Sequence, residues 1–155
     1  MSGRFVVVPA AYVYLLRPGP YPGAREVLLG LRSNTGYMDG YWASAIAGHV
    51  ESGESVYDAA AREAAEETGI RDVRLVPWCA MQRTGGTGDP IDERVDYFFT
   101  ATAWSGVPQV MEPEKCAEAR WCLLDALPSP VVPHELRVLS SIRAGSTPPI
   151  IMHGF

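Results

Sequence analysis

Residues 48–70 read GHVESGESVYDAAAREAAEETGI, a glycine-punctuated loop followed by a run rich in alanine and glutamate. The run from Ser55 to Thr68 contains neither glycine nor proline, and Gly69 follows it directly. This pattern predicts a helix over 55–68 with a glycine stop. Either Ser52 or Ser55 can cap its N-terminus through a side-chain oxygen. The sequence therefore predicts one well-delimited helix behind a loop whose glycines permit close backbone approach.

The predicted helix carries a stripe that changes from apolar to acidic along its length. At about 100° per residue, a stripe roughly 120° wide collects Val56, Ala59, Ala60, Glu63, Glu66 and Glu67. Like charges three and four residues apart destabilise a helix by about 0.2–0.5 kcal/mol per pair, and the helix dipole disfavours anions at this end. A site for a hard divalent cation explains the three carboxylates, because such ions prefer oxygen ligands.

Composition narrows the class of protein. The net charge of −5 and the pI near 5.1 argue against a broad basic surface for a nucleic acid polymer. Three cysteines without a C-x-x-C pair indicate a reducing, cytoplasmic environment. The chain has three histidines and no H-E-x-x-H motif, so the sequence offers few ligands for a zinc site. The apolar N-terminal stretch 1–16 is interrupted by Pro9 and is too short to span a bilayer, so we expect a buried strand and no membrane partner.

The rest of the chain predicts strands around two helices, within one domain over residues 1–155. Apolar and β-branched runs predict strands or short apolar pieces at 10–16, 26–32, 41–46, 73–83, 95–104 and 119–123. Residues 84–92 form a glycine-rich loop, residues 107–117 an irregular acidic segment, and residues 133–144 a second helix. This order predicts helices packed on a mixed sheet.

The spacing of Gly48, Glu54, Arg62-Glu63-Ala64, Glu66-Glu67 and Gly69-Ile70 is identified as the Nudix box of the Nudix (MutT-like) hydrolase family. Weaker similarity extends to the flanks, at Trp42 and at 118–128. The resemblance implies an α/β fold: a Nudix-type α/β/α sandwich with a mixed β-sheet between helices. The segment 43–47 departs from the family pattern, which usually has Pro-Gly or Pro-Ala before the box, and we expect a local bulge there.

The resemblance also implies roles for the residues of the box. Mg²⁺ or Mn²⁺ would bind the Gly48 carbonyl and the carboxylates of Glu63, Glu66 and Glu67. Glu54 and Arg62 would form a buried pair that orients the helix, which ends at Gly69.

The general base is open between the box and the acidic segment that follows it. Catalysis is expected from Glu66, Glu67 and a carboxylate outside the box, where the candidates are Glu112, Glu114 and Glu118. Of these three we favour Glu114, because it lies in the irregular stretch just before the 119–123 strand. Glu66 is the alternative base.

The substrate end is less defined. Arg32 and Arg94 could bind phosphates, and Asn34 and Tyr97 could hold or stack on a base, as could Phe99. The resemblance implies a metal-dependent pyrophosphohydrolase that cleaves a phosphoanhydride in a nucleoside diphosphate linked to another group, with a nucleoside triphosphate, oxidised forms included, as the leading small-molecule substrate.

Four alternatives stay open. A nucleotide sugar or a dinucleotide could be the substrate, and a non-catalytic nucleotide sensor is the alternative outside enzymes. Prenyl-diphosphate isomerisation is disfavoured because Cys79, Cys116 and Cys122 all follow the box, whereas that chemistry needs a cysteine upstream of it. The oligomeric state is not readable from the chain, although homodimers are common among soluble proteins.

Overall fold

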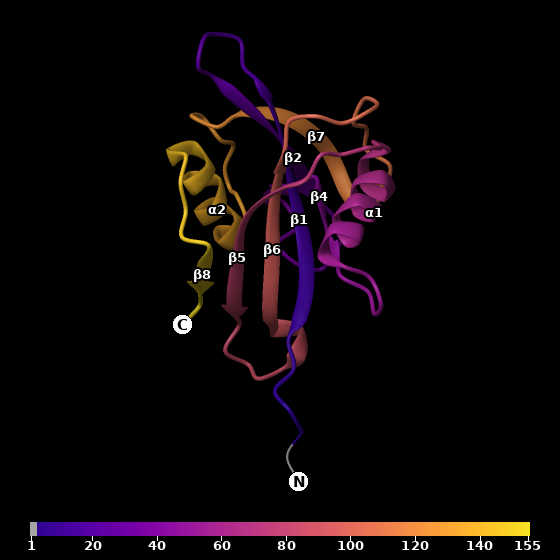
Figure 1. Cartoon of the computed structure of the whole chain (residues 1–155), viewed down its shortest axis with the longest axis vertical. Coiled ribbons are helices and arrows are strands. Elements are labelled where there is room, and N and C mark those ends of the chain that lie inside the picture. The colour runs from indigo at the N-terminus through magenta and orange to yellow at the C-terminus, as the bar shows by residue number, and fades with distance from the viewer. Residues whose placement is uncertain (1–2) are drawn as a thin grey trace.

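The computed structural model describes residues 3–155 and shows an eight-stranded mixed sheet with one helix on each side (Figure 1). The helices are α1 (Val56–Thr68) and α2 (Pro133–Ala144), and a 3₁₀ turn covers Pro90–Asp92. The strands are β1 (Val8–Pro18), β2 (Arg25–Arg32), β3 (Trp42–Ser44), β4 (Ile46–His49), β5 (Val76–Thr84), β6 (Glu93–Ala101), β7 (Cys116–Leu123) and β8 (Ile150–His153). Within residues 3–155, no helix is both long and apolar enough to cross a membrane.

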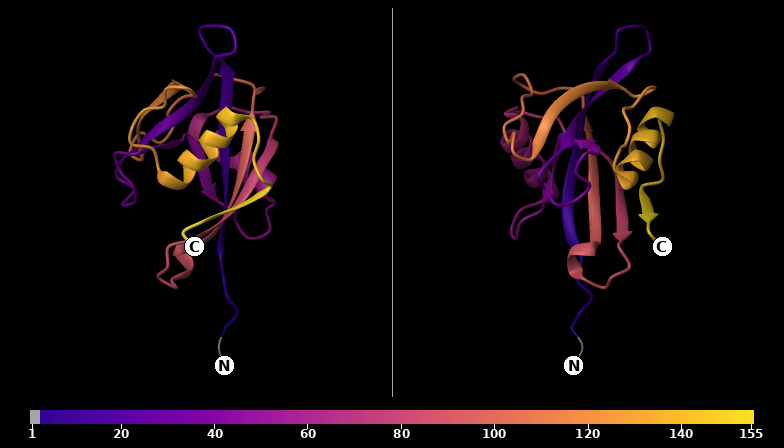
Figure 2. Two further views of the ribbon diagram at one scale, coloured as in Figure 1. Left: turned by 90° about the vertical axis from the view of Figure 1, so that its left-hand side faces the viewer. Right: turned by 180° about the vertical axis from the view of Figure 1, so that it is seen from behind.

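The long strand β1 joins two parts of the sheet. Its first half pairs with β4 and, in parallel, with β6, whereas its last residues pair with β2. The strand order is β3-β2-β1-β6-β5-β8, with β4 also on β1 and β7 also on β2. The pairs β1–β6 and β5–β8 are parallel and the remaining pairs are antiparallel, so the sheet is mixed as predicted. Figure 2 shows the two helices on opposite sides of these strands.

Both faces of β1 are buried, which explains its continuous apolar run. Tyr12 and Tyr14 belong to the core under α2, whereas Val13 and Leu15 belong to the core under α1. Because side chains alternate across a strand, one run supplies both cores. The sandwich expected from the family resemblance is therefore the observed fold.

The predicted bounds hold to within one residue for both helices, whereas several strands differ more. Strand β5 covers 76–84 instead of 73–83, β6 covers 93–101 instead of 95–104, and β7 covers 116–123 instead of 119–123. The second helix has the predicted bounds, and the first begins one residue later because Ser55 is its N-cap. The apolar piece 41–46 is divided at Ala45 between β3 and β4, so the expected irregularity before the box is a one-residue break. Strand β8 was not predicted. Of the N-terminal segment, residues 1–2 lie outside the described part, and the buried strand starts at Val8.

Candidate active site

Helix α1 is fixed at both ends and packed closely on the sheet. The Ser55 hydroxyl accepts a hydrogen bond from the Asp58 N–H at 3.1 Å. Gly69 has a φ of +76°, the left-handed conformation that favours glycine, and its N–H donates to the Ala65 carbonyl. The face toward the sheet carries small, buried side chains, Ala59, Ala60 and Ala64. This close packing fixes the position of the helix, and so of its glutamates, relative to β4.

Arg62 connects the helix to the loop before it. Its guanidinium donates to the two carboxylate oxygens of Glu54 at 2.7 and 3.1 Å and to the His49 carbonyl at 3.0 Å. The hydrogen bond from Arg62 holds the pKa of Glu54 below its ordinary value. The paired fork geometry is the strong form of this interaction. The structure thus forms the Glu54–Arg62 pair and uses it to hold the loop 48–54 against the helix.

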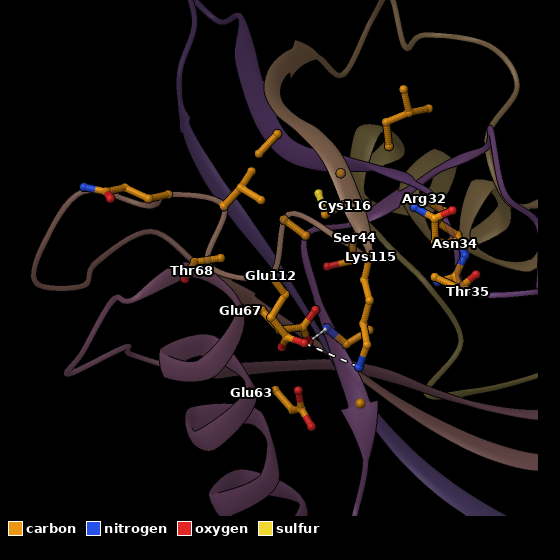
Figure 3. A pocket seen from close by; sticks show the side chains of 18 of the residues that line it. Arg32, Asn34, Thr35, Ser44, Glu63, Glu67, Thr68, Glu112, Lys115 and Cys116 are labelled. Atoms are coloured by element: carbon orange, nitrogen blue, oxygen red, sulfur yellow. Dashed lines mark hydrogen bonds and ion pairs between the residues drawn. The ribbon is translucent and has the colours of Figure 1, made fainter.

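Glu63 and Glu67 point from α1 into a pocket of about 550 Å³ (Figure 3). The Ala47 N–H of β4 donates to Glu67 Oε1 at 3.0 Å. Burial, followed by the hydrogen bond with the Glu63 carboxyl, raises the pKa of Glu67 to about 10. A Cβ at Gly48 would overlap the Glu63 carboxyl, which would have to move from its position. Two box carboxylates therefore crowd together over the first box glycine.

Glu66 is placed differently. Its side chain is 54% exposed, does not line the pocket, and lies 3.2 Å from Arg62 Nη1. The helical wheel puts Glu66 at the edge of the acidic stripe, and the nearby guanidinium draws it outward. Its assignment as a metal ligand or base stays a prediction.

The segment after β6 supplies a further carboxylate. The Gln109 and Met111 N–H groups donate to the carbonyls of Thr68 and Glu67, at 3.0 and 3.2 Å, so this segment is attached to the C-terminal turn of α1. The attachment brings Glu112 to the pocket beside Glu67. Lys115 Nζ lies 3.4 Å from Glu112 Oε2. We call Glu63, Glu67 and Glu112 the carboxylate wall (Figure 3).

Glu114, the favoured base of the sequence analysis, is exposed and does not line the pocket. Its backbone carbonyl accepts a hydrogen bond from Asn34 Nδ2 at 3.1 Å. Glu118 is exposed on β7 and pairs with Arg120. The candidate that reaches the pocket is Glu112, and the sequence contained no signal that separates it from Glu114. Lys115 was missed for the same reason.

The opposite end of the pocket is formed by the turn after β2. Arg32, Asn34 and Thr35 gather there, away from the carboxylate wall (Figure 3). Arg32 donates to the Tyr37 carbonyl at 2.8 Å and to the Thr35 hydroxyl at 3.0 Å. Tyr97 packs in the core under α1 instead of lining the pocket.

Of the remaining candidate side chains, Phe99 and Arg94 lie outside the pocket lining and Cys116 lies in it. Phe99 is buried and contacts the ring of Tyr57 edge-on. Arg94 also lies outside the pocket lining, on the far side of the sheet. Cys116, by contrast, lines the pocket, and burial raises the pKa of its thiol. The order of Cys116 along the chain therefore does not keep it from the site.

The residues present fit a divalent cation. The carboxylate wall faces two nearby cations, because Arg62 Nη1 lies 2.8 Å from Glu63 Oε1 and Lys115 Nζ lies 3.4 Å from Glu112 Oε2. Burial raises the pKa of Glu67, so a bound cation would favour the ionised form of this carboxyl group. Among residues 3–155 no three carboxylate, histidine or cysteine groups converge into a ready-made cage, because Arg62 and Lys115 engage several of these oxygens. Glu63, Glu67 and the Gly48 carbonyl are the groups placed to take Mg²⁺ or Mn²⁺, which prefer oxygen ligands.

The chain is similar to known proteins of one family, both in sequence and in fold. The family described as NUDIX domain matches residues 7–142, and the chain therefore belongs to the Nudix family. A crystal structure of a MutT Nudix hydrolase from Burkholderia pseudomallei is similar, with a TM-score of 0.73 and 28% identity over 85% of this chain and 94% of that one. The fold is thus shared with a protein of similar size.

Two curated relatives differ in the activity they are named for. An isopentenyl-diphosphate Δ-isomerase from Rhodobacter capsulatus is 32% identical over 108 residues, 68% of this chain and 61% of the relative. An NAD-capped RNA hydrolase, NudC, from Stutzerimonas stutzeri is 37% identical over 86 residues, 56% of this chain and 29% of the relative. The chain spans less than two thirds of the length of these curated relatives. The chain belongs to the Nudix family, and these likenesses fix neither its activity nor its substrate.

Proposed function

We propose that the chain is a Mg²⁺- or Mn²⁺-dependent pyrophosphohydrolase acting on a nucleoside diphosphate linked to another group. A nucleoside triphosphate, oxidised forms included, is the first substrate to test. The observation that carries the proposal is the carboxylate wall, which an intact Nudix box and a tethered segment bring to one pocket. A pocket of about 550 Å³ has the size expected for a small-molecule site. The cytoplasmic location and the homodimer stay predictions.

Each part of the pocket has a task in this reaction. Glu63, Glu67 and the Gly48 carbonyl would hold the metal, which supplies an acidified water and charge neutralisation at the phosphates. Glu112 is placed to accept the proton of the water that attacks phosphorus. The phosphorus–oxygen bond of the anhydride breaks, and the leaving phosphate takes the electron pair. Lys115 can donate hydrogen bonds to phosphate oxygens, and Arg32 and Asn34 face the nucleoside end.

A substrate panel with one inactive variant tests the proposal. The protein is incubated with Mg²⁺ and nucleoside triphosphates, nucleotide sugars and dinucleotides, and phosphate and pyrophosphate release are followed separately. We expect turnover that Glu67→Gln reduces at least a hundredfold, because the buried carboxylate is lost from the carboxylate wall. Glu118→Gln removes an exposed glutamate and should keep the rate.

The outcome separates the alternatives. Selective cleavage of a nucleotide sugar or dinucleotide assigns that substrate instead. Tight binding of a nucleotide without turnover supports the sensor. The absence of both binding and turnover would refute nucleotide chemistry at this site.

Isomerisation of a prenyl diphosphate is the second candidate, favoured by the isomerase relative and by Cys116 in the pocket. Such a reaction moves a double bond by adding a proton at one carbon and removing one at another, and a thiol beside carboxylates can exchange protons. Incubation with isopentenyl diphosphate in D₂O distinguishes it, because isomerisation incorporates deuterium and hydrolysis releases phosphate. Deuterium incorporation that Cys116→Ser abolishes would replace the hydrolase proposal.

A further inference from the structure

A second polar cluster lies on the α2 face of the sheet, outside the pocket. Arg83 of β5 and Arg94 of β6 are opposite each other in the strand register, and Asp96 is two residues further along β6. Residues two apart share a face, so these three side chains lie together. Arg83 Nε donates to Asp96 Oδ2 at 2.8 Å, and Arg94 Nη2 lies 3.7 Å from Asp96 Oδ1. His134, in the first turn of α2, lies 3.8 Å from the same carboxylate.

The cluster contains more positive than negative charge. Two guanidiniums face one fully buried carboxylate. His134 adds no charge, because burial lowers its pKa to about 2. The neighbouring side chains are basic as well: His153 is opposite Arg83 on β8, and Arg137 Nη1 lies 3.5 Å from His153 Nδ1. The two guanidiniums exceed the Asp96 carboxylate by one unit of positive charge, and Arg137 adds a second. Glu135 of α2 is the nearby acid, and burial raises its pKa to about 7.

The hydrogen bonding of the cluster is incomplete. Arg94 Nε and Asp96 Oδ1 are buried and have no hydrogen-bond partner. In the described chain, the only side-chain hydrogen bond from either guanidinium is that of Arg83 Nε. Buried polar groups are nearly always paired, and a buried ion pair by itself is weak evidence for a stabilising role. The side chains are 13% and 14% exposed, so an anion in solvent can reach the spare donors.

His49 lines the pocket and shares a sheet face with the cluster. His49 is opposite Ala10 in the β1–β4 pair, and Ala10 is opposite Asp96 in the β1–β6 pair, so His49 and Asp96 share a sheet face. Two strand spacings, roughly 10 Å, separate β4 from β6. A molecule whose diphosphate lies at Gly48 would pass His49 to reach the arginines on the α2 face.

We propose that Arg83 and Arg94, held apart by Asp96, form an anion subsite that binds a phosphate at the end of the substrate away from the scissile diphosphate. A guanidinium presents its donors in a planar fork that matches phosphate oxygens. Asp96 is fully buried and forms ion pairs with both arginines, so its negative charge offsets part of theirs. The subsite favours substrates with a phosphate besides the diphosphate, such as a nucleotide phosphorylated on its ribose. This statement about the substrate rests on the proposed function, whereas anion binding does not.

Inorganic phosphate is the first probe. It is titrated into metal-free protein with EDTA present, so that the carboxylate wall cannot hold it through a metal, and the arginine Nε–H resonances are followed by NMR. We expect saturable shifts of the Arg83 and Arg94 signals and at least a tenfold weaker affinity in Arg94→Gln. Arg143→Gln removes a guanidinium from an exposed ion pair with Asp125, 2.9 Å long, and should leave the affinity unchanged.

Asp96→Asn is a second variant that tests the subsite if Arg94→Gln is poorly folded. Removing the carboxylate raises the charge of the cluster by one, so phosphate should bind more tightly than in the natural protein. A purely structural ion pair predicts a lower melting temperature without tighter binding, and that result would overturn the subsite. Equal weakening in Arg94→Gln and Arg143→Gln would overturn it as well.

The second arm uses a nucleoside diphosphate and its 3′-phosphorylated counterpart. Arg94→Gln should lower kcat/KM at least tenfold for the phosphorylated compound, mainly through KM, and leave the other compound unaffected. If the natural protein hydrolyses neither compound under any metal condition, the proposed function fails, and the phosphate titration still decides the anion subsite.

Discussion

Replacing Glu135 with glutamine should make the protein relatively more stable as the pH rises. The Glu135 side chain comes from the first turn of α2 and is fully buried. Its Oε1 accepts hydrogen bonds from the Tyr14 hydroxyl and from the Ser44 N–H, both at 2.7 Å. Burial raises the pKa of Glu135 from 4.5 to about 7, despite these two hydrogen bonds. Glutamine keeps an acceptor oxygen and does not ionise.

The sign and size follow from the two pKa values. Below pH 4.5 the carboxyl is neutral in both the folded and the unfolded chain, and its stabilising contribution is fully present. As the pH rises, the unfolded chain ionises first, so the folded state loses stability until the pH exceeds the folded pKa of about 7. Each pKa unit corresponds to about 1.4 kcal/mol, so the shift of Glu135 amounts to about 3 kcal/mol. Glu135→Gln lacks this loss.

Urea unfolding at pH 4.5, 6, 7.5 and 9 measures the effect, with free energies of unfolding from linear extrapolation. The free energy of the variant minus that of the natural protein should rise by about 3 kcal/mol from pH 4.5 to 9. Glu118→Gln, which removes an exposed carboxylate, should give a difference that stays within about 0.5 kcal/mol. Parallel pH curves for Glu135→Gln and the natural protein would show that Glu135 is not held in its neutral form.

Three further predictions concern the same helix and the pocket. Burial lowers the pKa of His134 from 6.5 to about 2, so the natural protein should lose stability as the pH falls below 6.5, by about 3 kcal/mol at pH 4.5; urea unfolding of His134→Gln should lack this loss. Glu112→Gln should lower kcat at least tenfold and Glu114→Gln should not, since only Glu112 lines the pocket; the reverse order in steady-state rates would restore Glu114 as the base. Gly48→Ala should reduce turnover at least tenfold with an unchanged circular dichroism spectrum, because the added methyl overlaps the Glu63 carboxyl; an alanine variant with full activity would contradict this packing.

The two helices could be predicted from the sequence because their signals are local. Ser55, Gly69 and the alanine-rich stripe define α1 without any tertiary information, and Pro133 marks the start of α2. Strand β8 could not be predicted, because four residues with exposed Ile150 and Met152 become a strand only where the edge of β5 is free to pair. Edge pairing of this kind is a property of the assembled sheet.

The part of the candidate site that lies on one helix could be predicted from the sequence. The part that depends on contacts between two segments could not. A wheel places Glu63 and Glu67 on a common face, but it contains no information on Arg62, which competes for Glu66. The position of Glu112 depends on backbone hydrogen bonds between residues 109–111 and the end of α1. Neighbouring glutamates in an acidic segment are equivalent until those bonds form. Cys116 follows the box in the sequence, but the fold places it in the lining of the pocket.

A chain of contacts connects α2 to the carboxylate wall across the sheet. Glu135 holds the Ser44 N–H, and the Ser44 hydroxyl donates to the Val13 carbonyl and accepts from the Ile46 N–H. Ile46 begins β4, and the next N–H, that of Ala47, holds Glu67. The one-residue break before the Nudix box is therefore fixed from the α2 side. Burial raises the pKa of Glu135, so ionising this carboxyl would charge the acceptor of the first bond in the chain at the cost of a buried negative charge.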